Sequence, residues 1–201
     1  MHVRTPGGAA VADIIVFHHA QGLTDGVRAF ADTLREAGHR VTVPDLYDGA
    51  TFATLEEGID HADEVGFGVV IERALAAVDE LPSALVYVGF SLGVLPAQSL
   101  VQNRPGARGG VFFHSAVSPA DMGEPWPAGV PAQIHAMEDD ELFVEEGDLD
   151  AARELARIDG VELYLYDGDA HLFMDASLAE YDETAAALAT QRVLDFVASL
   201  G

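Results

Sequence analysis

Hydrophobic and polar positions divide this chain into two kinds of segment. Short runs of consecutive apolar residues, many of them branched, are typical of strands that are covered on both faces. Between these runs, apolar residues recur at helical spacing, as Val27, Phe30 and Leu34 do. The predicted strands are Asp13–His18, Arg40–Val43, Ala84–Phe90, Gly110–His114, Ala132–Met137 and Val161–Tyr166. The predicted helices are Asp25–Ala37, Leu92–Gln102, Asp148–Ala156 and Glu183–Leu200, with a partly helical stretch over Thr54–Glu80.

This alternation of strands and helices predicts an α/β fold. Strand–helix–strand units build a mostly parallel sheet with helices on both faces. Right-handed crossovers then place the loops that follow the strands along one edge, where such sheets bind ligands. A length of 201 residues, 49% of them hydrophobic, fits a single domain over residues 1–201 with no large cap domain.

Composition removes several classes of chemistry. The absence of cysteine excludes disulfides, thiolate metal sites and a cysteine nucleophile. All 10 basic side chains are arginines, so a phosphate-binding Walker lysine and a Schiff-base lysine are excluded too. The net charge of −24 favours solubility and predicts repulsion from nucleic acids and anionic membranes.

We expect the protein to be cytoplasmic. No apolar run approaches the roughly 20 residues that cross a bilayer. Met1–Ala12 lacks the basic segment followed by an apolar stretch that marks a signal peptide. The absence of cysteine is consistent with a reducing compartment.

The strongest motif is Gly89–Gly93 (GFSLG), which lies where a buried strand ends and a helix begins. A serine forced into such a turn has strained backbone angles and an exposed hydroxyl, and small flanking residues are needed. The N–H of Leu92, at the helix start, would face developing negative charge. Because a strand precedes the motif and a helix follows it, the motif predicts the nucleophile elbow of an α/β-hydrolase fold, with Ser91 as nucleophile.

The serine hydroxyl needs a base to take its proton, and this fold supplies it later in the chain, in the order serine, acid, histidine. His171 lies in a loop after the strand Val161–Tyr166 and before the last helix, where the general base belongs. His135 lies inside a predicted strand and is expected to be a buried structural residue. His114 comes too early to be the base, but it ends a strand near the same edge and is a pocket candidate.

The acid should follow the strand Ala132–Met137. Four residues qualify by position, namely Glu138, Asp139, Asp140 and Glu141. Three of them are expected to belong to a solvated acidic loop, while one holds the imidazole tautomer and stabilises the imidazolium. Asp140 is our choice, and Asp139 is the alternative.

A second oxyanion donor is expected in the loop after the first strand, His18–Gly22. The backbone N–H of Ala20 is the candidate. The adjacent histidines suggest a metal site as an alternative, but no third ligand at a sensible spacing is visible. We therefore predict no metal and no cofactor.

Nearly the whole chain resembles the dienelactone hydrolase family. The resemblance lies in the strand and oxyanion loop, a PDLY segment, the nucleophile elbow, and the acid and histidine segments, which here are Val16–Gly22, Pro44–Tyr47, Gly89–Gly93, Asp140–Phe143 and Gly168–Phe173. It implies the α/β-hydrolase fold, and it favours Asp140 over Asp139 as the acid.

Two departures from the family pattern bear on the substrate and the nucleophile. The best-known members have a cysteine where this chain has Ser91, and a thiol-controlling glutamate where it has His19. These differences are mutually consistent, because a serine paired with His171 needs no such carboxylate. Authentic dienelactone hydrolases also hold a substrate carboxylate with arginines, one of them at the position of Asp175. A carboxylate there would repel an anionic substrate, so we expect a substrate other than dienelactone.

These residues predict a serine hydrolase that cleaves a small ester or lactone through an acyl-enzyme, with water as the second substrate. A thioesterase or peptidase with the same triad, or an inactive hydrolase fold used for binding, are the alternatives. We expect no nucleic-acid or membrane partner, and a monomer or homodimer. Candidate pocket walls, each individually more typical of core or surface packing, are Phe17, His19, Tyr47, Phe90, His114, Trp126 and Phe143.

Overall fold

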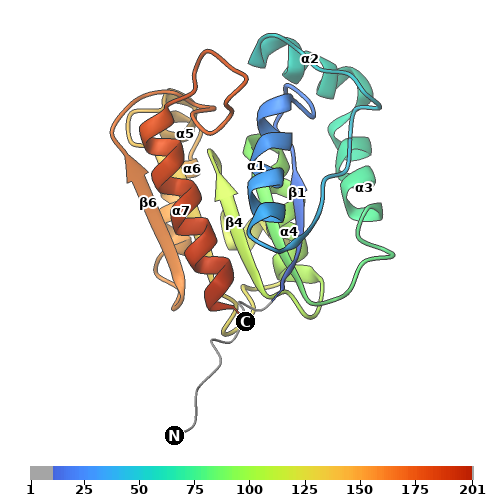
Figure 1. Ribbon diagram of the computed structural model, residues 1–201, viewed down its shortest axis with the longest axis vertical. Coiled ribbons are helices and arrows are strands. Elements are labelled where there is room, and N and C mark those ends of the chain that lie inside the picture. Colours follow the sequence, from blue (N-terminus) through green and yellow to red (C-terminus); the bar gives the residue numbers. More distant parts are fainter. Residues whose placement is uncertain (1–10, 201) are drawn as a thin grey trace, which may run out of the picture.

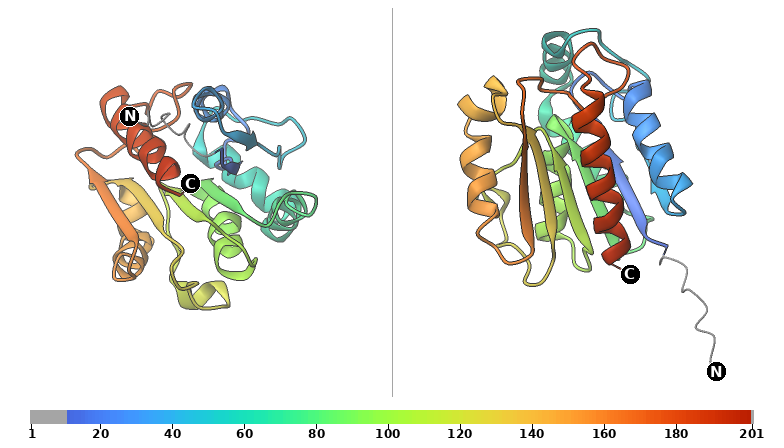
Figure 2. Two further views of the ribbon diagram at one scale, coloured as in Figure 1. Left: turned by 60° about the horizontal axis from the view of Figure 1, so that its bottom comes forward. Right: turned by 60° about the vertical axis from the view of Figure 1, so that its left-hand side comes forward.

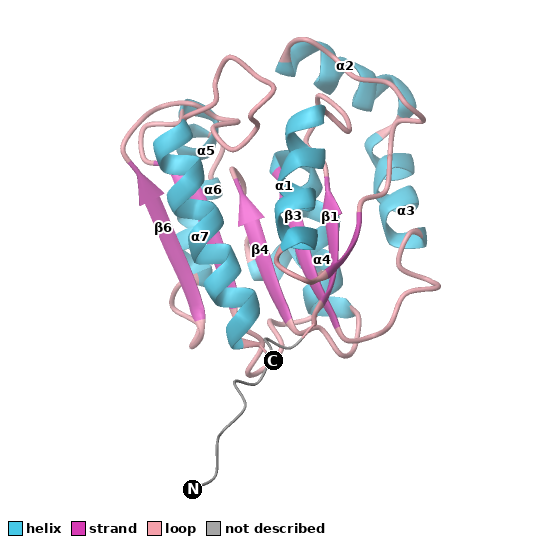
Figure 3. Ribbon diagram, viewed as in Figure 1, coloured by secondary structure: helices cyan, strands magenta, loops and turns pink. Residues whose placement is uncertain are grey.

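Six parallel strands form one central sheet in the computed structural model, which describes residues 11–200. The strand order is β2-β1-β3-β4-β5-β6, and every neighbouring pair is parallel. The carboxyl ends of the strands therefore lie at the same edge of the sheet (Figure 3). The strands are β1 (Asp13–Phe17), β2 (Arg40–Thr42), β3 (Leu85–Phe90), β4 (Gly109–Phe113), β5 (Ala132–Met137) and β6 (Val161–Tyr166).

Helices cover both faces of this sheet, as predicted (Figures 1 and 2). Helices α1 and α7 lie on one face, α3, α4 and α6 lie on the other, and α2 lies beyond the carboxyl ends of the strands. The helices are α1 (Asp25–Glu36), α2 (Leu55–Val65), α3 (Phe67–Ala76), α4 (Val94–Asn103), α5 (Glu141–Glu145), α6 (Asp148–Leu155) and α7 (Glu183–Ser199). Within residues 11–200, no helix is both long and apolar enough to cross a membrane.

Each face of the sheet has its own hydrophobic core. On one face, Phe30 of α1 and Val193 of α7 pack against β1, β3 and β4. On the other face, Ala74 of α3 and Ala97 of α4 pack with Tyr87 of β3. Strands β3, β4 and β5 are buried at every residue. This explains why β3 and β4 are apolar runs without alternation, whereas β5 also buries the polar side chains of Gln133 and His135.

The structure differs from the prediction mainly at short elements. The helix expected from Leu92 begins instead with a 3-10 turn, η1 (Ser91–Gly93), and α4 starts at Val94. A second 3-10 turn, η2 (Pro119–Met122), and the short helix α5 were not predicted. These elements are too short for hydrophobic periodicity to reveal them.

Candidate active site

Ser91 is the first residue of η1 and directly follows β3, in a sharp turn at the carboxyl edge of the sheet. Its backbone φ of 47° falls in the left-handed region, which is costly for a residue with a side chain. Two glycines allow this turn to pack closely. A Cβ on Gly89 would lie 2.4 Å from the Gly93 carbonyl oxygen, and a Cβ on Gly93 would lie 2.4 Å from the Phe17 carbonyl oxygen. The G-x-S-x-G pattern is therefore a steric requirement of this strand–turn–helix junction.

The structure brings Ser91, His171 and Asp140 together from three separate loops. The Ser91 Oγ lies 2.9 Å from His171 Nε2, and His171 Nδ1 lies 2.7 Å from Asp140 Oδ2. The side chains of His171 and Asp140 are 11% and 2% exposed. Because ionised Asp140 can only accept, His171 carries its proton on Nδ1 and leaves Nε2 free to accept the serine proton. This is the hydrogen-bond chain that a nucleophilic serine requires.

Asp140 is also the N-cap of α5. Its Oδ1 accepts a hydrogen bond of 3.1 Å from the Leu142 N–H, while Oδ2 faces His171. The neighbouring Glu138 and Asp139 are exposed, as the prediction of a solvated acidic loop required. Of the acidic residues in this loop, Asp140 is thus the one hydrogen-bonded to the imidazole.

The oxyanion loop is held by two histidines whose side chains are fully buried. His18 accepts a 3.0 Å hydrogen bond from the Leu46 N–H at Nε2, so its proton is on Nδ1, which lies 2.8 Å from the His19 carbonyl oxygen. Burial lowers the pKa of His18 to about 4, which keeps the ring neutral at physiological pH. The His19–Ala20 peptide bond is trans, so the Ala20 N–H points in the opposite direction to the His19 carbonyl, which is hydrogen-bonded to His18. Ala20 and Leu92 both line the cavity beside Ser91.

His19 itself points away from the cavity and pairs with Asp175. Its Nε2 lies 2.8 Å from Asp175 Oδ2, and both side chains are 0% exposed. Asp175 also accepts hydrogen bonds from the Thr24 hydroxyl (2.5 Å) and from the Ser177 N–H and hydroxyl (2.8 and 2.6 Å). Burial alone would raise the pKa of Asp175, but hydrogen bonds from His19, Ser177 and Thr24 outweigh it and lower the pKa to about 2.

This pairing corrects two sequence-based expectations. His19 is not a pocket residue, and Asp175 is too deeply buried to repel a substrate directly. Asp175 also fits only because residue 26 is glycine, since a Cβ there would lie 1.7 Å from Asp175 Oδ1. The available signal was a lone acid at the end of the apolar run Leu172–Met174, which is typical of a buried charge with a partner.

A cavity of about 340 Å³ opens beside Ser91. Most of its wall is apolar and comes from the oxyanion loop, from α2, α3, η1, α4 and α5, and from the loop after β4. Its polar part consists of Ser91, Ser115, Glu146, Asp148 and His171. The apolar part consists of Ala20, Leu55, Ile59, Phe67, Leu92, Leu95, Val117 and Leu142.

None of the predicted wall residues lines this cavity. The reason is that most of these aromatic side chains pack into the two cores. Phe17, Phe90 and Phe143 are 0% exposed. Tyr47 is buried against His18, with ring centroids 5.0 Å apart, Trp126 packs against Phe112, and His114 packs against Phe173. The remaining member of that prediction, His19, is bound to Asp175 as described above.

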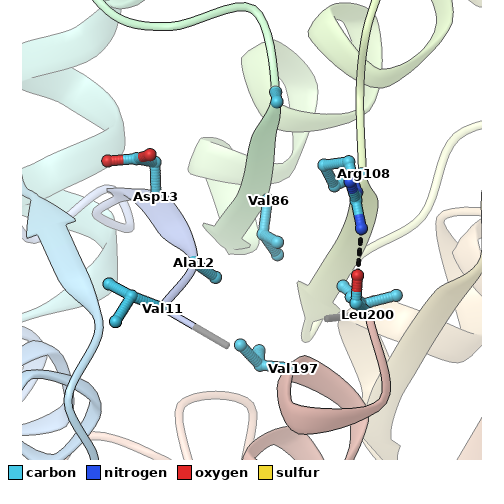
Figure 4. A pocket seen from close by; sticks show the side chains of 8 residues that line it. Val11, Ala12, Asp13, Val86, Arg108, Val197 and Leu200 are labelled. Carbon is cyan, nitrogen blue, oxygen red and sulfur yellow. Dashed lines mark hydrogen bonds between the residues drawn. The ribbon is translucent and has the colours of Figure 1, made fainter. Parts of the chain in front are cut away.

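A second hollow, of about 210 Å³, lies at the opposite edge of the sheet (Figure 4). Its wall includes Asp13 at the start of β1, Val86 in β3 and Leu200 after α7. The Arg108 guanidinium donates a hydrogen bond to the Leu200 carbonyl there. None of the lining residues is a serine or a histidine, so this hollow has no nucleophile–base pair.

Known proteins resemble this chain in sequence pattern and in fold. A model of the dienelactone hydrolase family matches residues 2–200. A dienelactone hydrolase-like promiscuous phosphotriesterase from metagenomic libraries is 22% identical, with a TM-score of 0.68 over 94% of this chain and 86% of that chain. A dienelactone hydrolase from Anabaena variabilis is 20% identical, with a TM-score of 0.64 over 94% and 86% of the two chains. The thioesterase domain from the curacin biosynthetic pathway is 14% identical, with a TM-score of 0.60 over 93% and 92%.

A search of curated proteins gave no match. At identities of 14–22%, the solved structures establish the fold, which is that of the α/β-hydrolases. The family model, by contrast, covers nearly the entire sequence. The chain therefore belongs to the dienelactone hydrolase family of hydrolases.

Proposed function

We propose that this protein hydrolyses a small carboxylic ester or lactone through an acyl-enzyme on Ser91. His171 removes the Ser91 proton as the hydroxyl attacks the carbonyl carbon, and the Ala20 and Leu92 N–H groups stabilise the oxyanion. The tetrahedral intermediate collapses, and His171 returns the proton to the departing alcohol. Water, activated by His171, then cleaves the acyl-enzyme and regenerates Ser91.

The single observation that carries this proposal is the continuous hydrogen-bond chain from Ser91 through His171 to Asp140. A chain of this kind raises the nucleophilicity of a hydroxyl that is otherwise a weak nucleophile. Ser91 lines a largely apolar cavity of about 340 Å³, which fits a small substrate.

The decisive test replaces the nucleophile. Ser91→Ala should abolish the turnover of p-nitrophenyl acetate and the labelling by a fluorophosphonate probe, while circular dichroism shows an intact fold. Ser118→Ala is the matched control, because Ser118 hydrogen-bonds Glu154 and does not line the cavity. Retained turnover in Ser91→Ala would refute the proposal, and a wild-type protein that resists the probe would favour an inactive, binding role.

The bond type is tested separately, by a screen of short acyl esters, lactones, thioesters and peptides with the wild type and Ser91→Ala. We propose ester or lactone cleavage, since the cavity is small and lies beside the serine without a large cap domain. Faster Ser91-dependent cleavage of thioesters or peptides would assign the same triad to one of those reactions.

We also propose that the enzyme acts in the cytoplasm on a small molecule, as a monomer or homodimer. The cysteine-free sequence and the net charge of −24 support this setting, since such a surface is soluble and is repelled by nucleic acids and anionic membranes. Fractionation of the source cells tests the cytoplasmic location, and light scattering of the purified protein tests the oligomeric state.

A further inference from the structure

The cavity beside Ser91 carries negative charge and no permanent positive charge. Two carboxylates, Glu146 and Asp148, belong to its wall, and none of its lining residues is an arginine. A neighbouring hollow of about 590 Å³, which also contacts His171, is lined by further acidic residues and again by no arginine. A substrate that reaches Ser91 therefore meets an uncompensated negative potential.

Asp148 is held in a defined position within this wall. Gly147 adopts a left-handed φ of 97°, and Asp148 begins α6 directly after it. The Ala116 N–H donates a hydrogen bond of 3.3 Å to Asp148 Oδ2, which ties the start of α6 to the loop after β4. Within residues 11–200, neither Asp148 nor Glu146 takes part in a salt bridge.

The environment of Asp148 differs from that of the many solvated acids on this surface. Its side chain is half-buried, and burial raises its pKa, while hydrogen bonds from Ser115 and Ala116 oppose that rise. Nearby Glu146 raises the pKa of Asp148 further, and His171 lowers it. In the same helix, Asp150 is 90% exposed, so water and salt screen its charge. The charge of Asp148 instead acts across a partly desolvated cavity, where Coulomb interactions are stronger.

Much of the cavity wall is apolar, and part of it is exposed to a ligand. Ile59 of α2 and Phe67 of α3 are 40% and 38% exposed, and both line the cavity together with Leu55. Apolar surface of this kind gains free energy when a substrate covers it. The cavity beside Ser91 thus combines apolar and anionic wall residues.

We propose, as an extension of the esterase function above, that the substrate is an ester with an ammonium group, held by Asp148 and Glu146, and an apolar portion. A substrate cation near these carboxylates would neutralise their negative charge, because no arginine lines the cavity. A carboxylate in the same position would be repelled by both residues. The specificity of the enzyme is therefore for cationic esters over neutral ones, and for neutral esters over anionic ones.

Three methyl esters with the same three-carbon spacer test this order. They are methyl 4-(trimethylammonio)butyrate, its uncharged carbon isostere methyl 5,5-dimethylhexanoate, and methyl hydrogen glutarate. A second pair, butyrylcholine and 3,3-dimethylbutyl butyrate, places the same charge difference in the alcohol portion. Acid release, followed at constant pH and low ionic strength, gives kcat/KM for each ester.

We expect the cationic ester to be cleaved with a kcat/KM about tenfold or more above that of its neutral isostere in at least one of the two series, and the anionic ester to be cleaved most slowly. Asp148→Asn should reduce the ratio of kcat/KM for the cationic ester to that for its neutral isostere several-fold. Asp150→Asn is the matched control, because it removes the same charge from an exposed position in the same helix and should leave the ratio unchanged.

Equal or faster cleavage of the neutral isosteres in both series would overturn the inference, as would an Asp148→Asn variant that slows all esters equally. The esterase proposal fails in a different way, since no ester would then show Ser91-dependent turnover. In that case, titration of the Ser91→Ala variant with the three methyl esters, followed by NMR, still measures the charge preference. Equal binding of the three would overturn the inference on its own.

Discussion

Two histidine–aspartate pairs lie close together in this protein, and they differ in what the second nitrogen of the histidine meets. In one pair, His171 Nδ1 lies 2.7 Å from Asp140, and Nε2 faces the Ser91 hydroxyl at 2.9 Å. In the other, His19 Nε2 lies 2.8 Å from Asp175, and Nδ1 accepts a backbone N–H. The two pair distances are almost the same. Distance within a pair therefore does not distinguish a base from a structural residue.

Access to a reacting atom distinguishes them. The side chain of His171 is 11% exposed and lines the cavity, whereas that of His19 is 0% exposed. Because protein groups occupy both nitrogens of His19, it can hold geometry but cannot accept a proton from a substrate or a nucleophile. It joins the oxyanion loop, which contains Ala20, to the segment that follows His171. In the proposed mechanism the first pair serves proton transfer, whereas the second keeps its surroundings in place.

The largest expected difference between the pairs is in kcat. Asp140→Asn should lower kcat by about 10³–10⁴-fold, because the amide no longer selects the Nδ1–H tautomer of His171. Asp175→Asn should lower it far less at temperatures where both variants are folded. Steady-state kinetics on the best ester of the screen provide the measurement.

Asp139→Asn is the matched control for this prediction, since Asp139 is the exposed neighbour that sequence position alone leaves as an alternative acid. It should retain nearly full activity. A large loss in Asp139→Asn together with a small loss in Asp140→Asn would show that the observed hydrogen bond is not the one used in catalysis.

The two pairs differ in how well the sequence predicts them, because one is marked by a local motif and the other depends on a contact between distant parts of the chain. Ser91 is marked by a local motif, and the predicted strands, which are confirmed as buried, fix which loops lie at the same edge of the sheet. The order of the chain then points to His171. Nothing local relates His19 to Asp175, because their contact joins residues 156 positions apart and depends on how α1 and the loop before α7 pack.

The cavity wall was predicted wrongly for a related physical reason. Aromatic residues near the carboxyl edge of the sheet were predicted to contact the ligand. In a parallel sheet that is covered on both faces, such residues are instead buried in the hydrophobic cores. The wall comes instead from partly exposed aliphatic and aromatic positions of α2 and α3, such as Ile59 and Phe67. Their orientation depends on the packing of a region where periodicity is interrupted at Gly66, so the sequence pattern did not single them out.

The second difference between the pairs is in stability. Asp175→Asn should lower the free energy of unfolding at pH 7 by about 2–4 kcal/mol, because the buried donors of His19 and Thr24, together with Ser177, lose a charged acceptor. Urea unfolding measures this. Asp32→Asn, which breaks an exposed pair with Arg35, is the control and should cost less than about 1 kcal/mol.

The pH dependence of this difference has a definite sign. The pKa of Asp175 is about 2 in the folded protein and 3.8 ordinarily, so its ionised form stabilises the fold above about pH 4. This contribution, of about 2 kcal/mol, is lost as the pH falls from 4 to 2. The stability gap between wild type and Asp175→Asn should therefore narrow over that range, and a gap that stays constant down to pH 2 would contradict the low pKa.

The smallest effect is expected where a histidine acts on the oxyanion donor through the backbone. His18 clamps the His19 carbonyl, whose peptide carries the Ala20 N–H. His18→Phe removes that clamp while keeping a ring of similar size, and should lower kcat about tenfold with little change in KM, since a slightly misdirected donor weakens binding of the transition state.

His18→Asn should recover part of this loss, because its amide can still donate to the same carbonyl. His135→Phe is the matched control, since His135 is equally buried and hydrogen-bonds Tyr166 at 2.8 Å without contacting the cavity. It should lower stability but leave kcat unchanged. If His18→Phe and His135→Phe change kcat by the same factor, His18 has no specific effect on the Ala20 N–H. The proposed positioning role of His18 would then be wrong.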